Sequence, residues 1–329
     1  MKKLLIVCAV FLVASGFTKE EIASKVDAGM FDEIKKAVIS AKQQQDPWAI
    51  FEAVKNNDYE AVAKLATKNN INKRDFTKHQ ATPLMWAAAR DYEDICKLLI
   101  DKGASLTLRD ADGWTAIMYS VDKNYPNTTR LFIKQARAKK IDEDMLYNKS
   151  KKDETILSVA VKQNAKKAID VIVGELGKEY RDCNRNTLLM TAVEKNNDAM
   201  VQYLAHDKKV DTNALNDFEE TPLMTAVYRD RKTDEEKNKR YKIVQILLAH
   251  YAKINAKNAL DKTALMCAAE KGRLAIVRYF LSDDRVQRKN GEEVEINAKD
   301  VYNKTALKYA LEFKQNETAK LLEEHGAKI

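Results

Sequence analysis

The four histidines are the residues of this chain best suited to acid–base catalysis or metal binding. They are His79, His206, His250 and His325. A zinc site or a Ser-His-Asp triad needs further ligands or partners, often visible as short spacings or local motifs. No histidine here has such a neighbour, and the glycine motifs GxxxxGK[ST] and GxGxxG do not occur. The sequence therefore predicts no catalytic, metal-ligating or cofactor-binding residue, and no enzyme.

Apart from Cys8, the cysteines are Cys96, Cys183 and Cys267. Their number is odd and their spacings match no zinc or redox motif, so free and mostly buried thiols are expected instead of a disulfide framework. Adjacent carboxylates such as Glu323-Glu324 stand close to lysines at helical surface positions. Solvated ion pairs are expected there, not acid–base chemistry.

The composition predicts that helices position these residues. Only 9 Gly and 4 Pro occur in 329 residues, too few for the tight turns of an all-β fold, whereas helix-favouring Ala, Leu, Lys and Glu are abundant. The net charge of +8 arises from 57 basic and 49 acidic residues that are interspersed along the chain. Because neither sign is concentrated, we expect a solvated surface and no nucleic-acid partner.

The first 16 residues have the order of an export signal. Lysines at positions 2 and 3 precede an unbroken apolar run from Leu4 to Ala14, and small residues follow as far as Gly16. This run is too short to span a bilayer, which needs about 20 residues. We therefore expect a signal peptide at 1–16, no stable membrane span, and an exported chain that is periplasmic or secreted. An uncleaved N-terminal anchor is the alternative.

A seven-residue pattern recurs along the rest of the chain. It reads TPLMWAA, TAIMYSV, TILSVAV, TLLMTAV, TPLMTAV, TALMCAA and TALKYAL, beginning at Thr82, Thr115, Thr155, Thr187, Thr221, Thr263 and Thr305. Successive threonines lie 33, 40, 32, 34, 42 and 42 residues apart. A base period near 33 with insertions accounts for these spacings, and a period of this size predicts a repeat architecture.

This pattern resembles the ankyrin repeat, a β-turn followed by two antiparallel helices that starts Thr-Pro-Leu-His-x-Ala. The segment DYEDICKLLIDKGA from Asp91 is similar to the second helix and Gly-Ala exit of the family, and it recurs as ETAKLLEEHGA from Glu317. Asn-containing turns such as NALN, NAKN and NAKD separate the units. The resemblance is to exported, bacterial-type ankyrin proteins. It implies an all-α solenoid of stacked helix-turn-helix units with β-turn or hairpin connections.

The resemblance covers essentially the whole chain after the signal. It implies a degenerate N-terminal capping repeat at 17–45 and an ankyrin array of about eight units at 46–329, the first of them divergent. Two charged insertions, 229–242 and 283–295, contain almost nothing apolar. They are expected to be exposed loops or helix extensions. Whether they bind anything is left open.

Local residue types support the unit boundaries. Thr before the first helix is expected to cap it, with Pro83 and Pro222 at the first helical position. Two residues before Thr, several units carry Gly, Asp or Asn, which favour a positive φ. Arg185 and Glu219 occupy that position in two others, where looser turns are expected.

One position departs from the family pattern. The histidine after Thr-Pro-Leu, which ties adjacent turns together by hydrogen bonds, is replaced by Met85, Met118, Ser158, Met190, Met224, Met266 or Lys308. A thioether packs well but cannot donate a hydrogen bond. Polar ties between repeats are therefore expected to be missing and replaced by apolar contacts.

The resemblance also implies where a partner binds. In an ankyrin unit the residue two after Leu and the residue before Thr face the concave groove. Large aromatic residues at these positions are Trp86, Trp114, Tyr119 and Tyr309, and the basic residues Arg90 and Lys123 lie one helical turn farther along the first helices. Exposed aromatics are frequent anchors of binding surfaces, and their alternative role is packing between units. The first three aromatics are expected to form one patch with a basic rim.

The expected function is that of an exported, non-enzymatic and monomeric adaptor or scaffold that holds a protein partner in the concave groove. A periplasmic protective or structural scaffold for an enzyme is one alternative. The other is a secreted effector whose repeats target a host protein. No non-repeat segment of about 50 residues is left over to form a catalytic domain.

Overall fold

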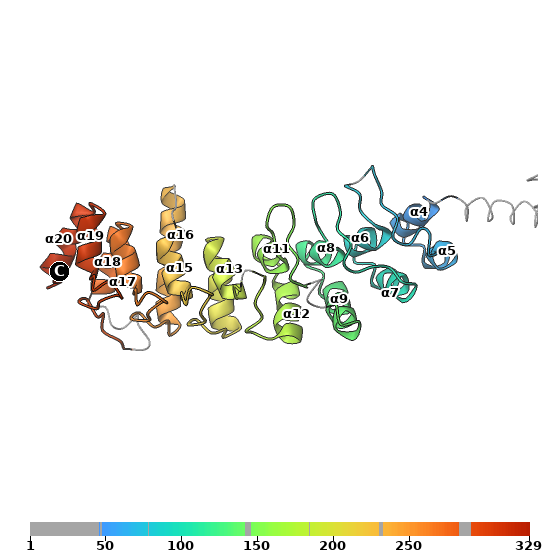
Figure 1. Cartoon of the computed structure of the whole chain (residues 1–329). Helices are drawn as coiled ribbons and strands as arrows, with labels where there is room; N and C mark the ends of the chain where they lie inside the picture. The colour runs from blue at the N-terminus through green and yellow to red at the C-terminus, as the bar shows by residue number, and fades with distance from the viewer. Residues whose placement is uncertain are drawn as a thin grey trace, which may run out of the picture. The chain divides into compact units, whose positions relative to one another are not determined.

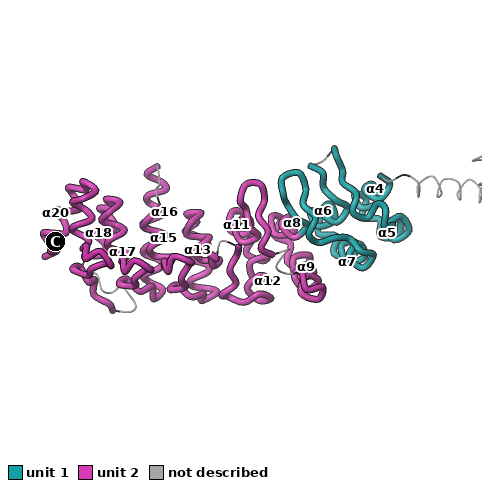
Figure 2. Tube along the Cα trace, viewed as in Figure 1, with its two compact units in different colours: residues 1–116 teal, residues 117–329 magenta. Residues whose placement is uncertain are grey.

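The computed structural model describes residues 46, 48–77, 79–141, 146–183, 185–229, 233–282 and 291–329 (Figure 1). Over these ranges the chain is helical and has no strand beyond two isolated β-bridges, Asp75 with Ala81 and Arg181 with Thr187. It divides into two compact units, residues 1–116 and 117–329 (Figure 2). The expected all-α class is confirmed. The predictions of an export signal at 1–16 and a capping repeat at 17–45 lie outside the described residues.

The described helices follow one another as hairpin pairs, a first helix and then a second. The first unit holds α4 (Ala49–Lys55), α5 (Tyr59–Leu65), α6 (Pro83–Ala88) and α7 (Glu93–Asp101). From the boundary between the units onward come α8 (Ala116–Asp122), α9 (Pro126–Ala138), α11 (Ile156–Lys162), α12 (Lys166–Leu176), α13 (Leu188–Glu194), α14 (Asp198–Gln202) continued by the π-helix η1 (Tyr203–Asp207), α15 (Pro222–Tyr228), α16 (Asp234–Ala249), α17 (Ala264–Glu270), α18 (Leu274–Leu281), α19 (Ala306–Glu312) and α20 (Asn316–Glu324).

The first helices begin where the sequence predicts because a threonine caps them. In six repeats the threonine Oγ1 accepts a hydrogen bond from the backbone N–H three residues later. The capping residues are Thr82, Thr155, Thr187, Thr221, Thr263 and Thr305. Pro83 and Pro222 occupy the first helical position, where the missing N–H costs nothing.

Stacking of the hairpins supplies the core. In the second unit the first helices contact one another in the order α11, α13, α15, α17 and α19, while α14, α16, α18 and α20 form a second row. Each short hairpin thereby buries the apolar stripe that it cannot cover alone. Small residues such as Ala268 and Ala269 are fully buried between neighbours, and Met224 and Met266 fill the same layer. The apolar packing expected of the methionines is confirmed.

The turns before Thr are uniform, which corrects one expectation. Arg185 and Glu219 have φ values of 60° and 55°, close to the 58° of Asp261 at the same position of another repeat. The reason lies three residues earlier, where a polar side chain holds the turn. Asn216 Oδ1 accepts the backbone N–H groups of Phe218 and Glu220 at 2.9 Å each. These hydrogen bonds offset the cost that a positive φ imposes on an ordinary residue.

Polar ties between repeats are present, so the expectation that they are missing is wrong. Asparagines at the exits of the repeats make them, in place of the family histidine. Asn255 is one example, because its Nδ2 donates to the carbonyl of Glu293 at 2.6 Å and its Oδ1 accepts the N–H of Glu295 at 3.0 Å. Asn213 and Asn297 join their own following repeats in the same way.

Replacing Asn255 by alanine is expected to lower the free energy of unfolding by about 1 to 2 kcal/mol, because two inter-repeat hydrogen bonds are lost. Urea denaturation followed by circular dichroism measures this change. Asn316 is a matched control, since the side chain of this exposed residue makes no hydrogen bond within the described ranges. Asn316→Ala should stay within about 0.5 kcal/mol of the parent chain. Equal stabilities for both variants would contradict a structural role for Asn255.

The charged insertion 229–242 is partly a helix extension, as expected. A capping box between Thr233 and Glu236 starts α16, which then runs for 16 residues. Arg240 within the insertion is only 3% exposed, which corrects the expectation of a fully solvated segment. Of the second insertion, residues 283–290 lie outside the described part, and the backbone that follows them provides the partners of Asn255.

Three cysteines belong to the described part, and all of them are free thiols. Cys96 and Cys267 are buried, whereas Cys183 is exposed in a turn. Burial raises the pKa of the Cys267 thiol to about 12 and also raises that of Cys96. These two thiols therefore remain protonated and packed in the core.

Candidate binding face

One side of the repeats carries a row of polar side chains, which we call the inner face. It is formed by the residue before each capping threonine together with residues at the end of the same first helix. In one repeat Glu154 pairs with Lys162 at 2.8 Å, and this bond raises the pKa of the Lys162 amine. The same spacing of eight residues joins Asn186 to Glu194, Lys262 to Glu270 and Lys304 to Glu312. Sequence reasoning missed these pairs, although opposite charges eight residues apart were a visible signal.

Trp86 on α6 and Arg90, two residues after the end of this helix, lie together in the first unit. The Arg90 guanidinium is 4.4 Å from the centre of the Trp86 ring and donates to the Trp86 carbonyl at 3.2 Å. Lys55 Nζ lies 5.0 Å from the same ring. The indole is half-buried and its Nε1 is buried. The ring therefore lies against two cations, so this part of the first unit is basic as well as aromatic.

Trp114 also belongs to the first unit and is half-buried. Its backbone is fixed by the turn, because its N–H donates to Asp110 Oδ1 at 2.8 Å and its carbonyl accepts the N–H of Asp110 at 2.9 Å. Tyr119 and Lys123 lie on and just after α8, where Tyr119 is half-buried and Lys123 is exposed and pairs with Asp122 at 3.1 Å. A joint patch of Trp86, Trp114 and Tyr119 stays a prediction.

Tyr309 is buried, which corrects the expectation that it presents an exposed aromatic ring. It is 7% exposed, and its hydroxyl donates to Asp300 Oδ2 at 2.6 Å. Lys262 Nζ lies 4.0 Å from the ring centre. Tyr309, two residues after Leu307, therefore packs within the stack of repeats. The alternative role, packing, holds for Tyr309.

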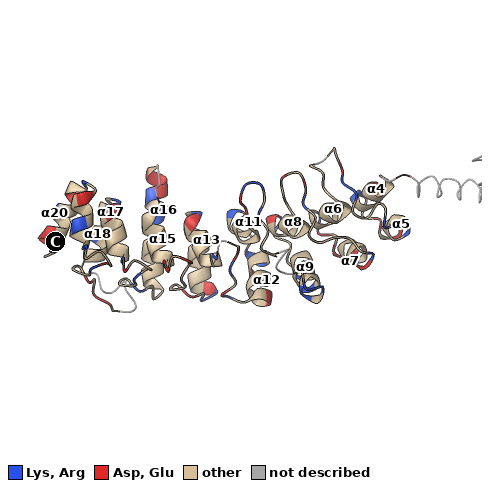
Figure 3. Cartoon of the chain, in the orientation of Figure 1, with Lys and Arg blue, Asp and Glu red and all other residues tan. Residues whose placement is uncertain are grey.

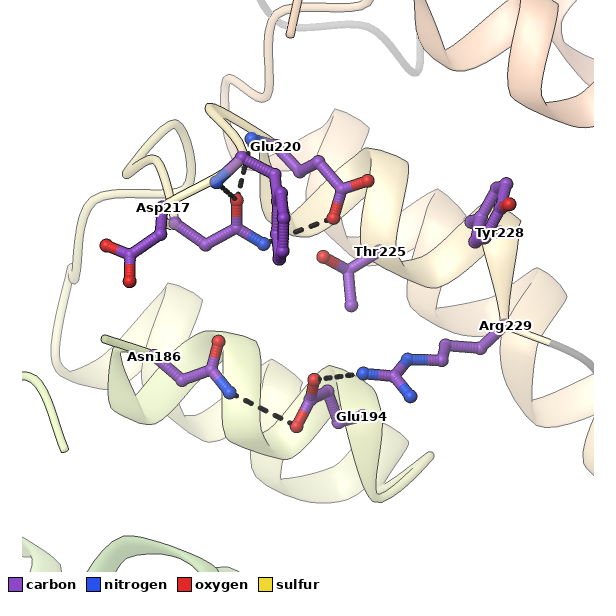
Figure 4. Close-up of a pocket in the computed structure, with 9 residues that line it drawn as sticks. Asn186, Glu194, Asp217, Glu220, Thr225, Tyr228 and Arg229 are labelled. Atoms are coloured by element: carbon purple, nitrogen blue, oxygen red, sulfur yellow. Dashed lines mark hydrogen bonds and ion pairs between the residues drawn. The ribbon is translucent and has the colours of Figure 1, made fainter. Parts of the chain in front are cut away.

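A cleft between α13 and α15 opens on the inner face of the second unit, and sequence reasoning did not find it (Figure 4). Its volume is about 430 Å³. The lining residues are Asn186, Glu194, Asn216, Asp217, Phe218, Glu220, Thr225, Tyr228 and Arg229. Phe218 and Tyr228 are exposed at 71% and 42%. Aromatic residues in the turn at 218 and at the end of α15 at 228 were the available sequence signal, but only the fold brings two repeats together around them.

A second cleft, of about 560 Å³, lies near α11 and α13 and is basic. Four lysines outnumber two acidic residues in its lining, which consists of Lys152, Lys162, Lys195, Lys239, Glu154, Asp198 and three asparagines. The first cleft has more acidic than basic residues in its lining and the second has more basic than acidic ones, although they lie on neighbouring repeats. Over both units as a whole, basic and acidic residues are intermixed (Figure 3).

No site for a metal ion is formed within the described ranges, where His, Cys, Asp and Glu side chains make no group of three or more suited to hold one. The rings of His206 and His250 lie near each other, with centres 5.6 Å apart, and Asp207 Oδ1 is 2.8 Å from His206 Nδ1. No helix among the same residues is both long and apolar enough to cross a membrane.

Comparison with known proteins agrees with the fold. The family model for ankyrin repeats (3 copies) matches residues 22–110, 50–145, 157–258 and 235–329. The chain therefore belongs to the ankyrin-repeat family, whose repeats serve protein–protein interaction. Among solved structures, the ankyrin repeat domain of Bcl-3 aligns with a TM-score of 0.50 and 23% identity over 67% of this chain and 92% of that one. This likeness shows the fold.

Similar curated proteins match only a part of the array. M-phase phosphoprotein 8 of Rattus norvegicus and of Mus musculus is 39% identical over 80 residues, and that of Homo sapiens is 36% identical over the same length. The match covers 23% of this chain and 9% of each of those proteins. The chain thus spans about a tenth of the length of these relatives.

Proposed function

We propose that this chain is an exported, non-enzymatic adaptor or scaffold that holds a partner protein on the inner face of its ankyrin stack. The cleft between α13 and α15 is the observation that carries the proposal. Two aromatic rings, Phe218 and Tyr228, are exposed there around an open hollow. Aromatic residues at a concave polar surface are frequent anchors of protein interfaces.

Export and the domain limits are part of the proposal. The Lys-apolar-small order of residues 1–16 supports a signal peptide and a periplasmic or secreted location. The family match that starts at residue 22 supports a degenerate repeat at 17–45 before the array of 46–329. The partner is a protein, and the chain acts as a monomer.

Affinity capture from an extracytoplasmic fraction tests the proposal. The tagged chain should retain a reproducible partner, and its own N-terminus should begin within a few residues of Phe17. A double variant, Lys152→Glu with Lys195→Glu, reverses charge in the basic cleft of the inner face. It should retain less partner, because glutamates at these two positions repel the acidic partner groups that a basic cleft attracts.

A matched control reverses two exposed lysines of the second helices, Lys167→Glu on α12 and Lys320→Glu on α20. The control should capture the partner normally. Equal capture by both double variants would contradict docking on the inner face, and intact Met1 in a cytosolic fraction would contradict export. A captured enzyme that survives heating longer in the presence of the chain would favour the protective scaffold, and a captured host protein would favour the effector.

A further inference from the structure

We propose that the cleft between α13 and α15 binds the guanidinium group of an arginine side chain on the partner protein. The existence of that partner rests on the proposed function, whereas the chemistry of the cleft does not. The argument uses the hydrogen-bonding groups, the charges and the aromatic rings of the lining.

The lining offers acceptors. Asn186 is only 9% exposed, and its Nδ2 donates to Glu194 at 3.3 Å. Its Oδ1 is directed into the cleft and has no hydrogen-bond partner within the described residues (Figure 4). Thr225 donates its hydroxyl hydrogen to the carbonyl of Thr221 at 3.2 Å, so its oxygen faces a ligand as an acceptor. Because the cleft is open, the Asn186 oxygen can accept a hydrogen bond from a ligand.

The charges of the lining call for a cation. Glu220 accepts a hydrogen bond from Asn216 Nδ2 at 3.1 Å, and no basic side chain of the described part forms an ion pair with it. Asp217 points away from the cleft in Figure 4 and pairs with Arg185 at 3.3 Å. A ligand that brings a positive charge therefore meets the carboxylate of Glu220.

The cleft already holds one guanidinium, from its own chain. Arg229 extends to Glu194 and donates from Nη2 at 2.6 Å (Figure 4). This bond satisfies Glu194 but leaves Asn186 Oδ1 and Glu220 available. Phe218 is largely exposed and offers an aromatic face to a planar cation, whereas Lys271 Nζ already lies 4.4 Å from the centre of the Tyr228 ring. Aromatic faces attract cations, and Arg stacks on them.

Arginine fits this inventory better than other side chains. A guanidinium has five N–H donors and no acceptor, which matches a lining of an amide oxygen, a hydroxyl oxygen and a carboxylate. Lysine has only three donors on one point charge and does not stack. An ionised acidic side chain has no donor, and a neutral amide has two donors but no positive charge to meet Glu220.

The test uses N-acetylarginine amide as the probe and the full chain labelled on its threonine methyl groups for NMR. Saturable shifts are expected at Thr225 and not at Thr318 of α20, with a dissociation constant in the millimolar range, as for a single side chain. N-acetylcitrulline amide has the same shape without the charge and should not saturate. N-acetyllysine amide should bind several-fold more weakly.

Two variants locate the site. Glu220→Gln retains an acceptor for Asn216 but removes the charge, and it should raise the dissociation constant about tenfold. Glu323→Gln, an exposed carboxylate of α20, should leave it unchanged. If Glu220→Gln lowers the melting temperature, Phe218→Ala provides an independent test, because this exposed ring can be removed without affecting the core and should weaken binding several-fold.

The proposal is overturned if the arginine probe fails to saturate Thr225, if citrulline or lysine binds as tightly, or if neither variant weakens binding. Failure of this inference is distinguishable from failure of the proposed function. A chain that captures a partner but ignores the arginine probe keeps the function and loses the inference. A chain that binds the arginine probe but captures no protein keeps the inference about the cleft and loses the proposed function.

Discussion

Replacing Tyr309 by alanine is expected to lower the free energy of unfolding by about 3 to 5 kcal/mol, the range for removing a buried aromatic ring. The ring is 7% exposed in α19 and lies beneath Lys262. Its loss leaves a cavity and also removes the hydroxyl that donates to Asp300, a carboxylate that is 6% exposed. Urea denaturation of the full chain measures the change. Loss of less than about 1 kcal/mol would contradict the core position of this ring.

Tyr309→Phe separates the hydrogen bond from the packing. This variant keeps the ring and should cost about 1 to 2 kcal/mol at pH 7. Burial raises the pKa of Asp300, but hydrogen bonds from Tyr309 and from the backbone N–H groups of Lys304 and Tyr302 outweigh burial and leave the pKa below its usual value.

The pH dependence of Tyr309→Phe follows from that direction. A carboxyl whose pKa is lowered by folding stabilises the fold above its unfolded pKa of about 3.9, and this contribution is lost as the pH falls through the folded pKa. The variant lacks one of the bonds that lower the pKa. The difference in stability between the parent chain and Tyr309→Phe should therefore shrink as the pH falls below the unfolded pKa of about 3.9. A constant difference would show that the hydrogen bond does not depend on the charge of Asp300.

Trp114→Ala is expected to weaken binding of the captured partner by about 2 kcal/mol or more, roughly a 30-fold rise in the dissociation constant. The side chain is half-buried, and the turn that carries it is fixed by backbone bonds to Asp110. Its truncation should therefore cost less stability than the loss of a fully buried ring. Affinity by calorimetry and thermal unfolding are both measured on the same variant.

Trp48→Ala is the matched control for Trp114→Ala, because Trp48 is 41% exposed and lies before α4 in the same unit. It should bind the partner normally. If Trp114→Ala instead loses about 3 to 5 kcal/mol of stability, the ring belongs to the packing between repeats. Normal affinity with a normal fold would remove Trp114 from the binding face.

The sequence by itself determined the repeat, the helices and their starting points. These features depend on residues close to one another along the chain, such as the threonine cap and the N–H three residues later, or the period of the apolar stripe. For the same reason the sequence limited the segment 229–242 to an exposed loop or a helix extension, of which the structure shows the second in part. The environment of each side chain on that face was not predictable in this way.

Tertiary structure decided the contacts that join repeats 30 to 40 residues apart, an interval set by the repeat period. Tyr309 and Tyr119 occupy the same position in their repeats. Tyr309 is buried and Tyr119 is half-buried, because each meets a different neighbouring repeat. Asn255 could be read as a turn residue, but its two bonds to the following repeat exist only in the stack. The cleft beside Glu220 is formed likewise, since two repeats must pack together before their carboxylates, amides and aromatic rings surround one space.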